Sequence, residues 1–241
     1  MAKTTRDQLQ LGDFPGLTLL TALEEVCGVK VLHLSFQPTG TAAFVVSESF
    51  GAGILLNSEN TRWRRNFDLA HELFHLLTWR QFRERGSSDS LDEGGKEEQL
   101  ADCFASALLI PEEPLRNLME QFKGARGIPI SSVFDVARRF DVSTEALLWR
   151  IHNLFRSRGQ ADQTRRDIER VQNLSTVFEK REPDRPSEKP ERFHALAVSA
   201  LRNGEISIGR FAQLVGASRQ QAVKFLEQDG PDDREATLVL T

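Results

Sequence analysis

Residues 71–75 read His-Glu-Leu-Phe-His, and the fold that we expect follows from this stretch. Side chains four positions apart lie on one face of an α-helix, so His71 and His75 can turn an imidazole nitrogen toward one metal ion. Glu72 is rotated by about 100° from His71, which places its carboxylate beside such an ion, where it could take a proton from water. The stretch therefore predicts a helical metal site with Glu72 as the general base.

A catalytic zinc site usually has three protein ligands and one open position, so a further donor is needed. We predict Glu98 as this ligand, because Asp102 follows it one helical turn later. Glu98 would bind the metal while Asp102 accepts the spare ring N–H of a ligand histidine, which we expect to be His71. Glu97 is the alternative ligand, although Asp102 does not share its helix face. Two imidazoles and a carboxylate suit Zn²⁺, and they also accept Mn²⁺ or Fe²⁺.

Apolar residues at spacings of three and four predict helices around both parts of this site. No Gly or Pro interrupts residues 61–82, and Pro111 ends the second run. A shorter helix is expected at residues 17–26, ended by Gly28. Three segments with strand patterns lie between these helices: 30–36, 41–46 and 53–57. The prediction is an α+β fold, mostly helical, with a small antiparallel β-sheet before the metal helix and a polar connector at residues 84–96.

Two blocks of the sequence resemble the ImmA/IrrE metallopeptidase family. Residues 67–76 read Phe-Asp-Leu-Ala-His-Glu-Leu-Phe-His-Leu, and residues 98–111 read Glu-Gln-Leu-Ala-Asp-Cys-Phe-Ala-Ser-Ala-Leu-Leu-Ile-Pro. The resemblance covers roughly residues 15–155 and implies a zincin-like metallopeptidase domain. It also implies the following roles: His71, His75 and Glu98 as metal ligands and Glu72 as catalytic base.

The chain departs from the family pattern at two positions. The family more often has Asn at the position of Asp102 and Gly at the position of Phe74. Aspartate can still orient a histidine, and Phe74 is expected to face away from the ligands. Members of the family cut XRE-type helix-turn-helix repressors, which releases genes of mobile elements or of stress responses to DNA damage. The resemblance therefore implies an XRE-type repressor or antitoxin as the substrate.

Two later segments, residues 136–143 and 211–218, echo each other at an offset of 75. Each is followed by a second amphipathic run, which predicts two helix-turn-helix units with Ser143 and Ser218 as N-caps. We expect the first helix-turn-helix to pack on the peptidase core. The expected domains are a metallopeptidase domain (1–157, including helix-turn-helix-like helices at about 131–157), a charged helix and linker (158–191) and a small helical C-terminal module (192–241).

Composition limits the classes of partner. The net charge of -4 over 241 residues gives no footprint for nucleic-acid binding by the whole chain, so DNA binding is only weakly supported. Cys27 and Cys103 stand in apolar stretches and are expected to be core residues in a reducing compartment. No stretch approaches the ~20 apolar residues of a membrane span, so we expect a cytoplasmic protein without a membrane partner.

Alternative functions and roles remain open at this stage. The chain could be a non-catalytic regulator that binds protein or DNA, although Glu72 has no use in a purely structural metal site. It could also be one component of a toxin–antitoxin pair. His152 and His194 are candidates for oxyanion stabilisation by residue type only, and a structural role is favoured for both. His33 is expected to be a surface or half-buried residue of a strand.

Overall fold

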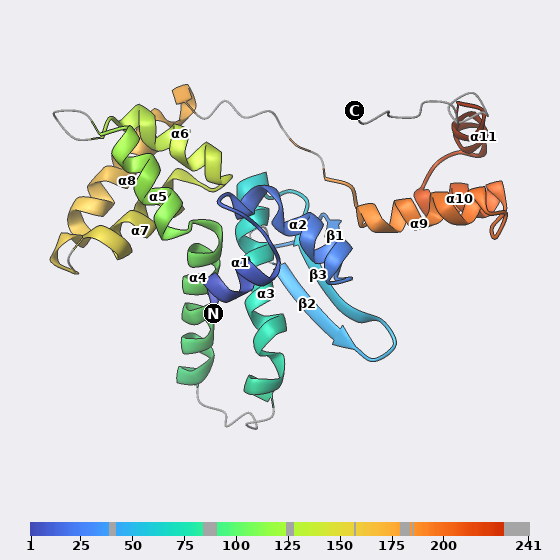
Figure 1. Cartoon of the computed structure of the whole chain (residues 1–241), viewed down its shortest axis with the longest axis horizontal. Coiled ribbons are helices and arrows are strands. Elements are labelled where there is room, and N and C mark those ends of the chain that lie inside the picture. Colours follow the sequence, from blue (N-terminus) through green and yellow to red (C-terminus); the bar gives the residue numbers. More distant parts are fainter. Residues whose placement is uncertain are drawn as a thin grey trace, which may run out of the picture. The chain divides into compact units, whose positions relative to one another are not determined.

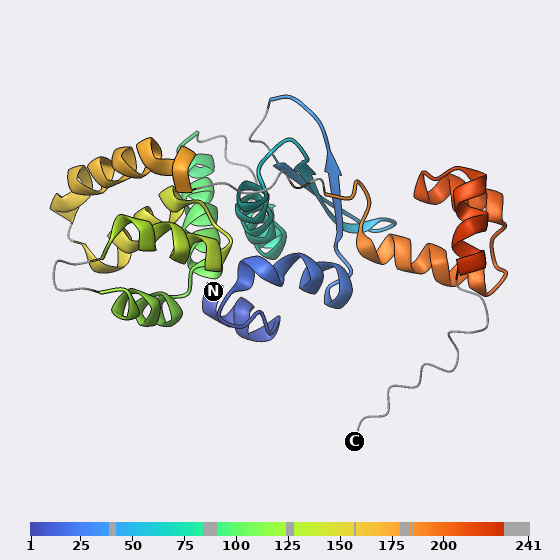
Figure 2. The same ribbon diagram turned by 90° about the horizontal axis from the view of Figure 1, so that it is seen from above.

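The computed structural model describes residues 1–38, 42–83, 91–123, 128–156, 158–178, 184 and 186–228. The chain forms two compact units, Met1–Glu188 and Lys189–Thr241. Figures 1 and 2 show the first unit as a small sheet with helices packed around it, and the second as a group of helices. Within the described part of the chain, no helix is long and apolar enough to cross a membrane.

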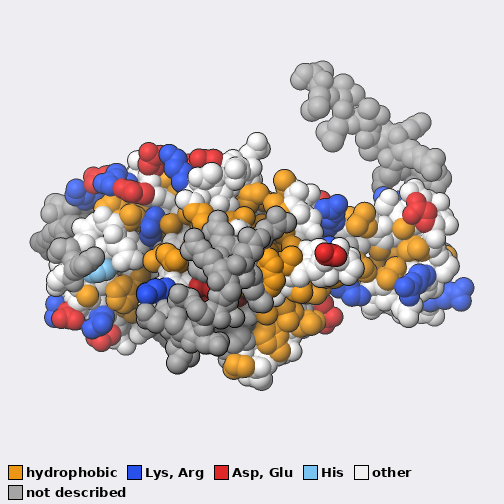
Figure 3. All heavy atoms as spheres, turned by 90° about the horizontal axis from the view of Figure 1, so that it is seen from below, with side chains coloured by type: hydrophobic (Ala, Val, Ile, Leu, Met, Phe, Trp, Pro, Cys, Tyr) orange, Lys and Arg blue, Asp and Glu red, His pale blue; other side chains and the backbone are white. Residues whose placement is uncertain are grey.

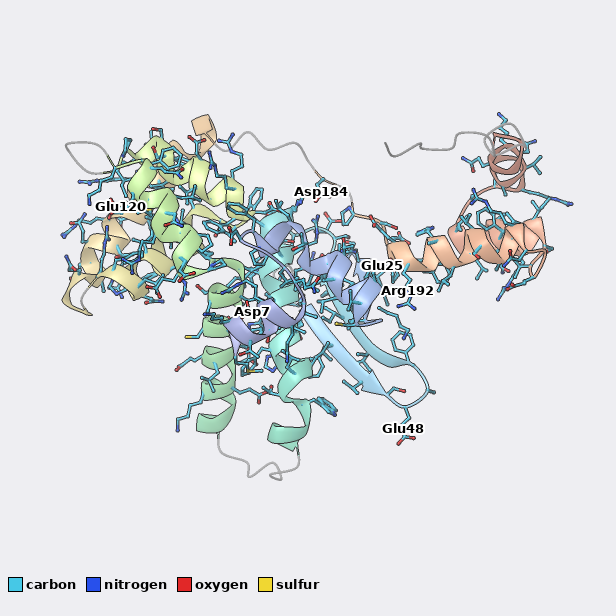
Figure 4. The ribbon with its side chains drawn as sticks, viewed as in Figure 1. Asp7, Glu25, Glu48, Glu120, Asp184 and Arg192 are labelled. Atoms are coloured by element: carbon cyan, nitrogen blue, oxygen red, sulfur yellow. The ribbon has the colours of Figure 1, made fainter. Side chains whose placement is uncertain are left out.

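The sheet of the first unit contains β1 (Lys30–Leu34), β2 (Ala42–Ser47) and β3 (Gly51–Asn57) in the order β1-β3-β2. Strands β2 and β3 form an antiparallel hairpin, with Glu48 at its turn (Figure 4). Strand β1 pairs with β3 in parallel, so the expectation of a wholly antiparallel sheet was wrong. The strands do alternate in direction along the chain, but β1 takes the far edge of β3 instead of pairing with β2.

An irregular helical run precedes the sheet. It follows α1 (Ala2–Gln8) and consists of three short pieces: η1 (Pro15–Leu17), α2 (Leu19–Thr21) and η2 (Ala22–Val26). Leu19 and Leu23 are almost fully buried, and Gly28 leaves the run with a φ of 67°. Only glycine adopts such a positive φ without strain, so Gly28 ends the helix as expected. Cys27 and Cys103 are free and exposed, which corrects their expected place in the core.

Two long helices follow, α3 (Arg62–Arg83) and α4 (Leu91–Leu109), and they run side by side in opposite directions (Figure 1). Helix α3 also packs against β2 and β3. Helix α4 starts earlier than expected, so residues 91–96 are helical and do not form a connector. Once a helix is nucleated, each added residue gains a hydrogen bond, which allows it to extend through the glycines there. The remainder of the expected connector, 84–90, lies outside the described residues.

The remaining helices of the first unit are α5 (Glu112–Gln121), α6 (Ile130–Phe140), α7 (Thr144–Phe155), η3 (Arg158–Gln160) and α8 (Ala161–Phe178). Helices α6 and α7 form the first predicted helix-turn-helix, in which the Ala146 amide donates to Ser143 Oγ at 3.1 Å. Phe134 and Phe140 of α6 are almost fully buried in the main core. The charged helix expected within residues 158–191 is α8, and its Ile168 and Val171 belong to the same core, so α8 lies in the first unit.

Part of the expected exposed linker also packs on the first unit. Asp184 forms an ion pair with Arg65 of α3, and Figure 4 labels its position. The His33 amide donates to the Glu188 carbonyl at 3.0 Å, and His33 Nδ1 lies 3.1 Å from the Ser187 carbonyl oxygen. His33 is only 6% exposed, because these residues cover the free edge of β1.

The second unit contains α9 (Glu191–Arg202), α10 (Ile208–Val215) and α11 (Arg219–Gln228). The sequence predicts its helix-turn-helix shape correctly. Gly216 has a φ of 72° at the end of α10, and Ser218 and Gln221 exchange capping hydrogen bonds of 2.8 and 3.2 Å. Its buried core is small and consists of Ala197, Leu201, Phe211, Ala212 and Ala222. The last residues, 229–241, lie outside the described part of the chain.

A close approach between η1 and the α6–α7 turn requires Gly16. A Cβ atom at this position would lie 2.4 Å from the Phe140 carbonyl oxygen. Asn66 of α3 donates to the Gly16 and Asp141 carbonyls, both at 3.1 Å, so the start of α3 is fixed at the same point. This junction fixes the start of α3 against the turn between α6 and α7.

We therefore expect Gly16→Ala to destabilise the protein by about 1–3 kcal/mol, because the backbone carbonyl must shift to admit the methyl group. The matched control is Gly95→Ala on α4, where the Cβ position is open. This second change should be neutral or stabilising by up to about 1 kcal/mol, since alanine favours helix. Urea denaturation of both variants measures the difference, and equal stabilities would contradict the close packing at Gly16.

His33 should make stability depend on pH. Burial and then the nearby Arg65 charge lower the pKa of His33 from its usual 6.5. The unfolded chain therefore binds a proton more readily, so stability is retained above about pH 6.5 and falls as the pH drops below it. His33→Asn keeps a donor for the Ser187 carbonyl but does not titrate. Between about pH 8 and pH 5.5, the urea midpoint should fall further in the wild type than in this variant.

Candidate metal centre

The predicted ligands converge between α3 and α4. The Nε2 atoms of His71 and His75 lie 3.2 Å apart on α3. Glu98 approaches from α4, with Oε2 3.1 Å from His71 Nε2 and Oε1 3.5 Å from His75 Nε2. Among the described residues, these three form the group whose possible metal-binding atoms all lie within 4.8 Å of one another. The structure thus brings together the three residues that the sequence suggested.

The spacing of these donor atoms fits a bound transition-metal ion. Zinc–nitrogen and zinc–oxygen bonds of about 2.0–2.2 Å in a tetrahedron place neighbouring donors about 3.4 Å apart. The three measured separations, 3.1, 3.2 and 3.5 Å, lie close to this value. Two imidazoles with one carboxylate form a donor set that Zn²⁺, Mn²⁺ and Fe²⁺ accept. The residues present therefore fit a divalent cation without rearrangement of the helices.

Carboxylates also contact the outer nitrogens of both histidines. Asp102 Oδ1 lies 2.9 Å from His71 Nδ1, the contact expected from the sequence. Glu97 Oε1 lies 2.9 Å from His75 Nδ1, a contact that was not expected. Because Nδ1 is on the other side of the ring from the converging Nε2 atoms, Glu97 is not placed as a third ligand. Glu98 is the carboxylate that lies close to both Nε2 atoms.

Glu72 lies next to the ligands in a buried environment and is 7% exposed. Burial raises the pKa of Glu72, and the charges of His71 and His75 oppose this shift only in part. A carboxylate in such a place binds a proton more tightly than an exposed one, which suits a general base.

Aromatic side chains form one wall of the site. The Phe44 ring of β2 lies parallel to the His75 ring at 5.6 Å between centroids, with an angle of 2°. Trp79, one turn after His75 on α3, meets the Phe44 ring edge-on at 5.3 Å. Phe74 is buried against Phe104, with ring centroids 5.6 Å apart. Its ring also meets the His75 ring edge-on at 5.7 Å, so Phe74 contacts one of the histidines and does not face away from them as expected. The histidine ring is therefore held by packing from the sheet side.

Other sequence candidates lie elsewhere. The ring of His152 contacts Thr164 of α8, with Nδ1 3.1 Å from Oγ1, and His194 lies on α9 of the second unit. A hollow of about 620 Å³ is lined by residues of α5 to α8 and includes none of the metal-centre residues. This hollow is therefore not the site around the metal ligands.

The chain is similar to a curated protein and to a solved structure. A curated protein, the radiation response metalloprotease IrrE of Deinococcus deserti, is 31% identical over 132 residues. The match covers 51% of this chain and 43% of that protein, so the chain spans less than half the length of this relative. A solved Mycobacterium tuberculosis transcriptional regulator superposes with a TM-score of 0.45 at 20% identity, over 65% of this chain and 46% of that one.

A family model described as IrrE N-terminal-like domain matches residues 24–152. This range contains the residues of the centre, namely His71, Glu72, His75, Glu97, Glu98 and Asp102. It also covers the whole sheet and helices α3 to α6. Because the match extends over more than half of the 241 residues, the chain belongs to the Peptidase_M78 family of IrrE N-terminal-like domains.

Proposed function

We propose that this protein is a metal-dependent endopeptidase that uses zinc and acts in the cytoplasm. The observation that carries the proposal is the convergence of two imidazole nitrogens and a carboxylate at 3.1–3.5 Å, with Glu72 buried beside them. A structural metal site needs its ligands and the groups that orient them, so a buried acidic residue at the position of Glu72 is better explained by catalysis. Family membership and the name of the curated relative support the same activity.

The reaction requires a Lewis acid and a base. When bound, a divalent cation supplies the Lewis acidity that polarises the scissile carbonyl and makes water more acidic. Glu72 takes the proton of the attacking water and then delivers it to the leaving amine.

For the substrate, we propose an XRE-type helix-turn-helix repressor, presented as an extended segment. Strand β2 supports this substrate form, because among the described strands it has a neighbour on one side only. An extended peptide can add to such an edge by main-chain hydrogen bonds. Figure 3 shows hydrophobic side chains over this hairpin, and Val45, Val46 and Phe50 are each more than 40% exposed. A cleavable segment with apolar residues would fit there.

The helix-turn-helix of the second unit favours a second candidate function, that of a regulator or toxin–antitoxin component acting by binding. The exposed side chains of α11 include Arg219, Gln221 and Lys224, which could contact a partner protein or DNA. This function does not need Glu72. The two candidates therefore differ in their dependence on that residue.

We expect the purified wild-type chain to hold one zinc ion per molecule, measured by inductively coupled plasma mass spectrometry. His75→Ala should lose the ion, because one of three donors is removed. His152→Ala is the matched control and should retain it, since His152 contacts Thr164 and not the centre. Equal metal contents in these two variants would contradict the proposed ligand set.

Cleavage should depend on Glu72. With a helix-turn-helix repressor encoded beside this gene as substrate, Glu72→Gln should lower the rate by about 10²–10⁴-fold, the usual contribution of a general base. The same variant should keep its metal, because Glu72 is not a ligand. Electrophoresis with mass spectrometry of the fragments measures the cleavage. Undiminished cleavage by Glu72→Gln would refute the assigned base, and a metal-loaded wild type that cuts no such repressor would favour the binding function.

A further inference from the structure

The outer face of His75 is held by Glu97, which the sequence pattern suggested only as an alternative metal ligand. Glu97 Oε1 lies 2.9 Å from His75 Nδ1, the same separation that Asp102 Oδ1 has from His71 Nδ1. The Glu97 side chain is 27% exposed, against 62% for Glu98 and 60% for Asp102. Of the three carboxylates that α4 presents to the histidines, Glu97 is thus the most enclosed.

The antiparallel packing of α3 and α4 explains this contact. Going from His71 to His75 advances about one turn along α3, and going from Asp102 to Glu97 goes back by about 1.4 turns along α4. Each histidine therefore meets its own carboxylate from the facing helix. Glu98 lies between these two contacts and reaches both Nε2 atoms.

We infer that Glu97 is a positioning residue that fixes the tautomer and rotation of His75 for metal binding. A carboxylate at Nδ1 accepts the ring N–H there, which leaves the lone pair on Nε2. Phe44 lies flat against the same ring and sets its plane, while Glu97 sets the direction within that plane. Together they aim Nε2 at the point where His71 Nε2 and Glu98 converge.

This inference rests on the proposed metal centre, and its test measures metal binding as well as activity. Outer carboxylates of this kind typically contribute 10–100-fold in metal affinity. In chelator competition with Zn²⁺, Glu97→Ala should weaken binding by about this factor. Glu97→Gln should recover part of the loss, because its amide oxygen can still accept the Nδ1–H bond. Glu113→Ala removes an exposed carboxylate on α5 and is the charge-matched control, expected to bind within about twofold of wild type.

A second readout separates positioning from a general effect on folding. Histidine ¹⁵N NMR of the metal-free protein should show His75 protonated on Nδ1 in the wild type and in Glu97→Gln. In Glu97→Ala the signal should shift toward a mixture with the Nε2–H form. The urea midpoints of the metal-free Glu97 variants should not fall below that of the wild type, since each variant removes one charge from a cluster of carboxylates.

The outcomes distinguish this inference from the proposed function. If the wild type binds metal but Glu97→Ala and Glu113→Ala have equal affinities, the role of Glu97 alone is overturned. The same holds if the His75 tautomer is unchanged in Glu97→Ala. A wild type that binds no divalent cation overturns both. If Glu97→Ala loses affinity and the wild type cleaves no peptide, Glu97 retains its role and the peptidase activity is refuted.

Discussion

The metal centre depends on one constraint, the close antiparallel packing of α3 and α4. The side chains that reach across are as short as Asp102, so the helix axes must approach closely and in a fixed register. Ala70 of α3 and Ala101 and Ala105 of α4 are fully buried. Interaxial distance follows the size of the side chains at a helix contact, so alanines at these positions favour the close approach. The ligand distances are therefore set by residues that carry no chemistry themselves.

The remainder of the first unit holds these two helices in place. Arg150 of α7 donates to the Ile110 carbonyl at 3.0 Å, and Arg6 of α1 donates to the Ala107 carbonyl at 3.3 Å. Both contacts satisfy carbonyls at the C-terminal end of α4, where a positive charge is also favourable. On the other side, β2 presses Phe44 against His75. Contacts from α1 and α7 thus position the end of α4, and the contact from β2 positions His75 on α3.

The sequence predicts features that depend on one helix more readily than contacts between two elements, although the expected contact of Asp102 with His71 is present. His71, His75 and the pairing of Glu98 with Asp102 follow from helical periodicity, which is a local property. The role of Glu97 could not be seen this way, because its partner lies on the facing helix. The signal that could have shown it is the reverse order of the partners along two antiparallel helices. The earlier histidine, His71, meets the later acid, Asp102, so the later histidine, His75, should meet an earlier acid. Similarly, the strand segments were recognised, but the parallel pairing of β1 with β3 depends on tertiary packing that periodicity does not encode.

The same arrangement has an electrostatic cost, because it brings several acidic side chains close together. Glu72, Glu97, Glu98 and Asp102 place four carboxylates around two imidazoles, and like charges a few ångströms apart repel. A divalent cation reverses this repulsion, and binding to the folded state alone stabilises it by about 2.7 kcal/mol at 100 times Kd. Before the cation binds, the packing of α3 against α4 must hold the two helices together against that repulsion. The packing of these helices thus allows several negative charges to lie close together at one point.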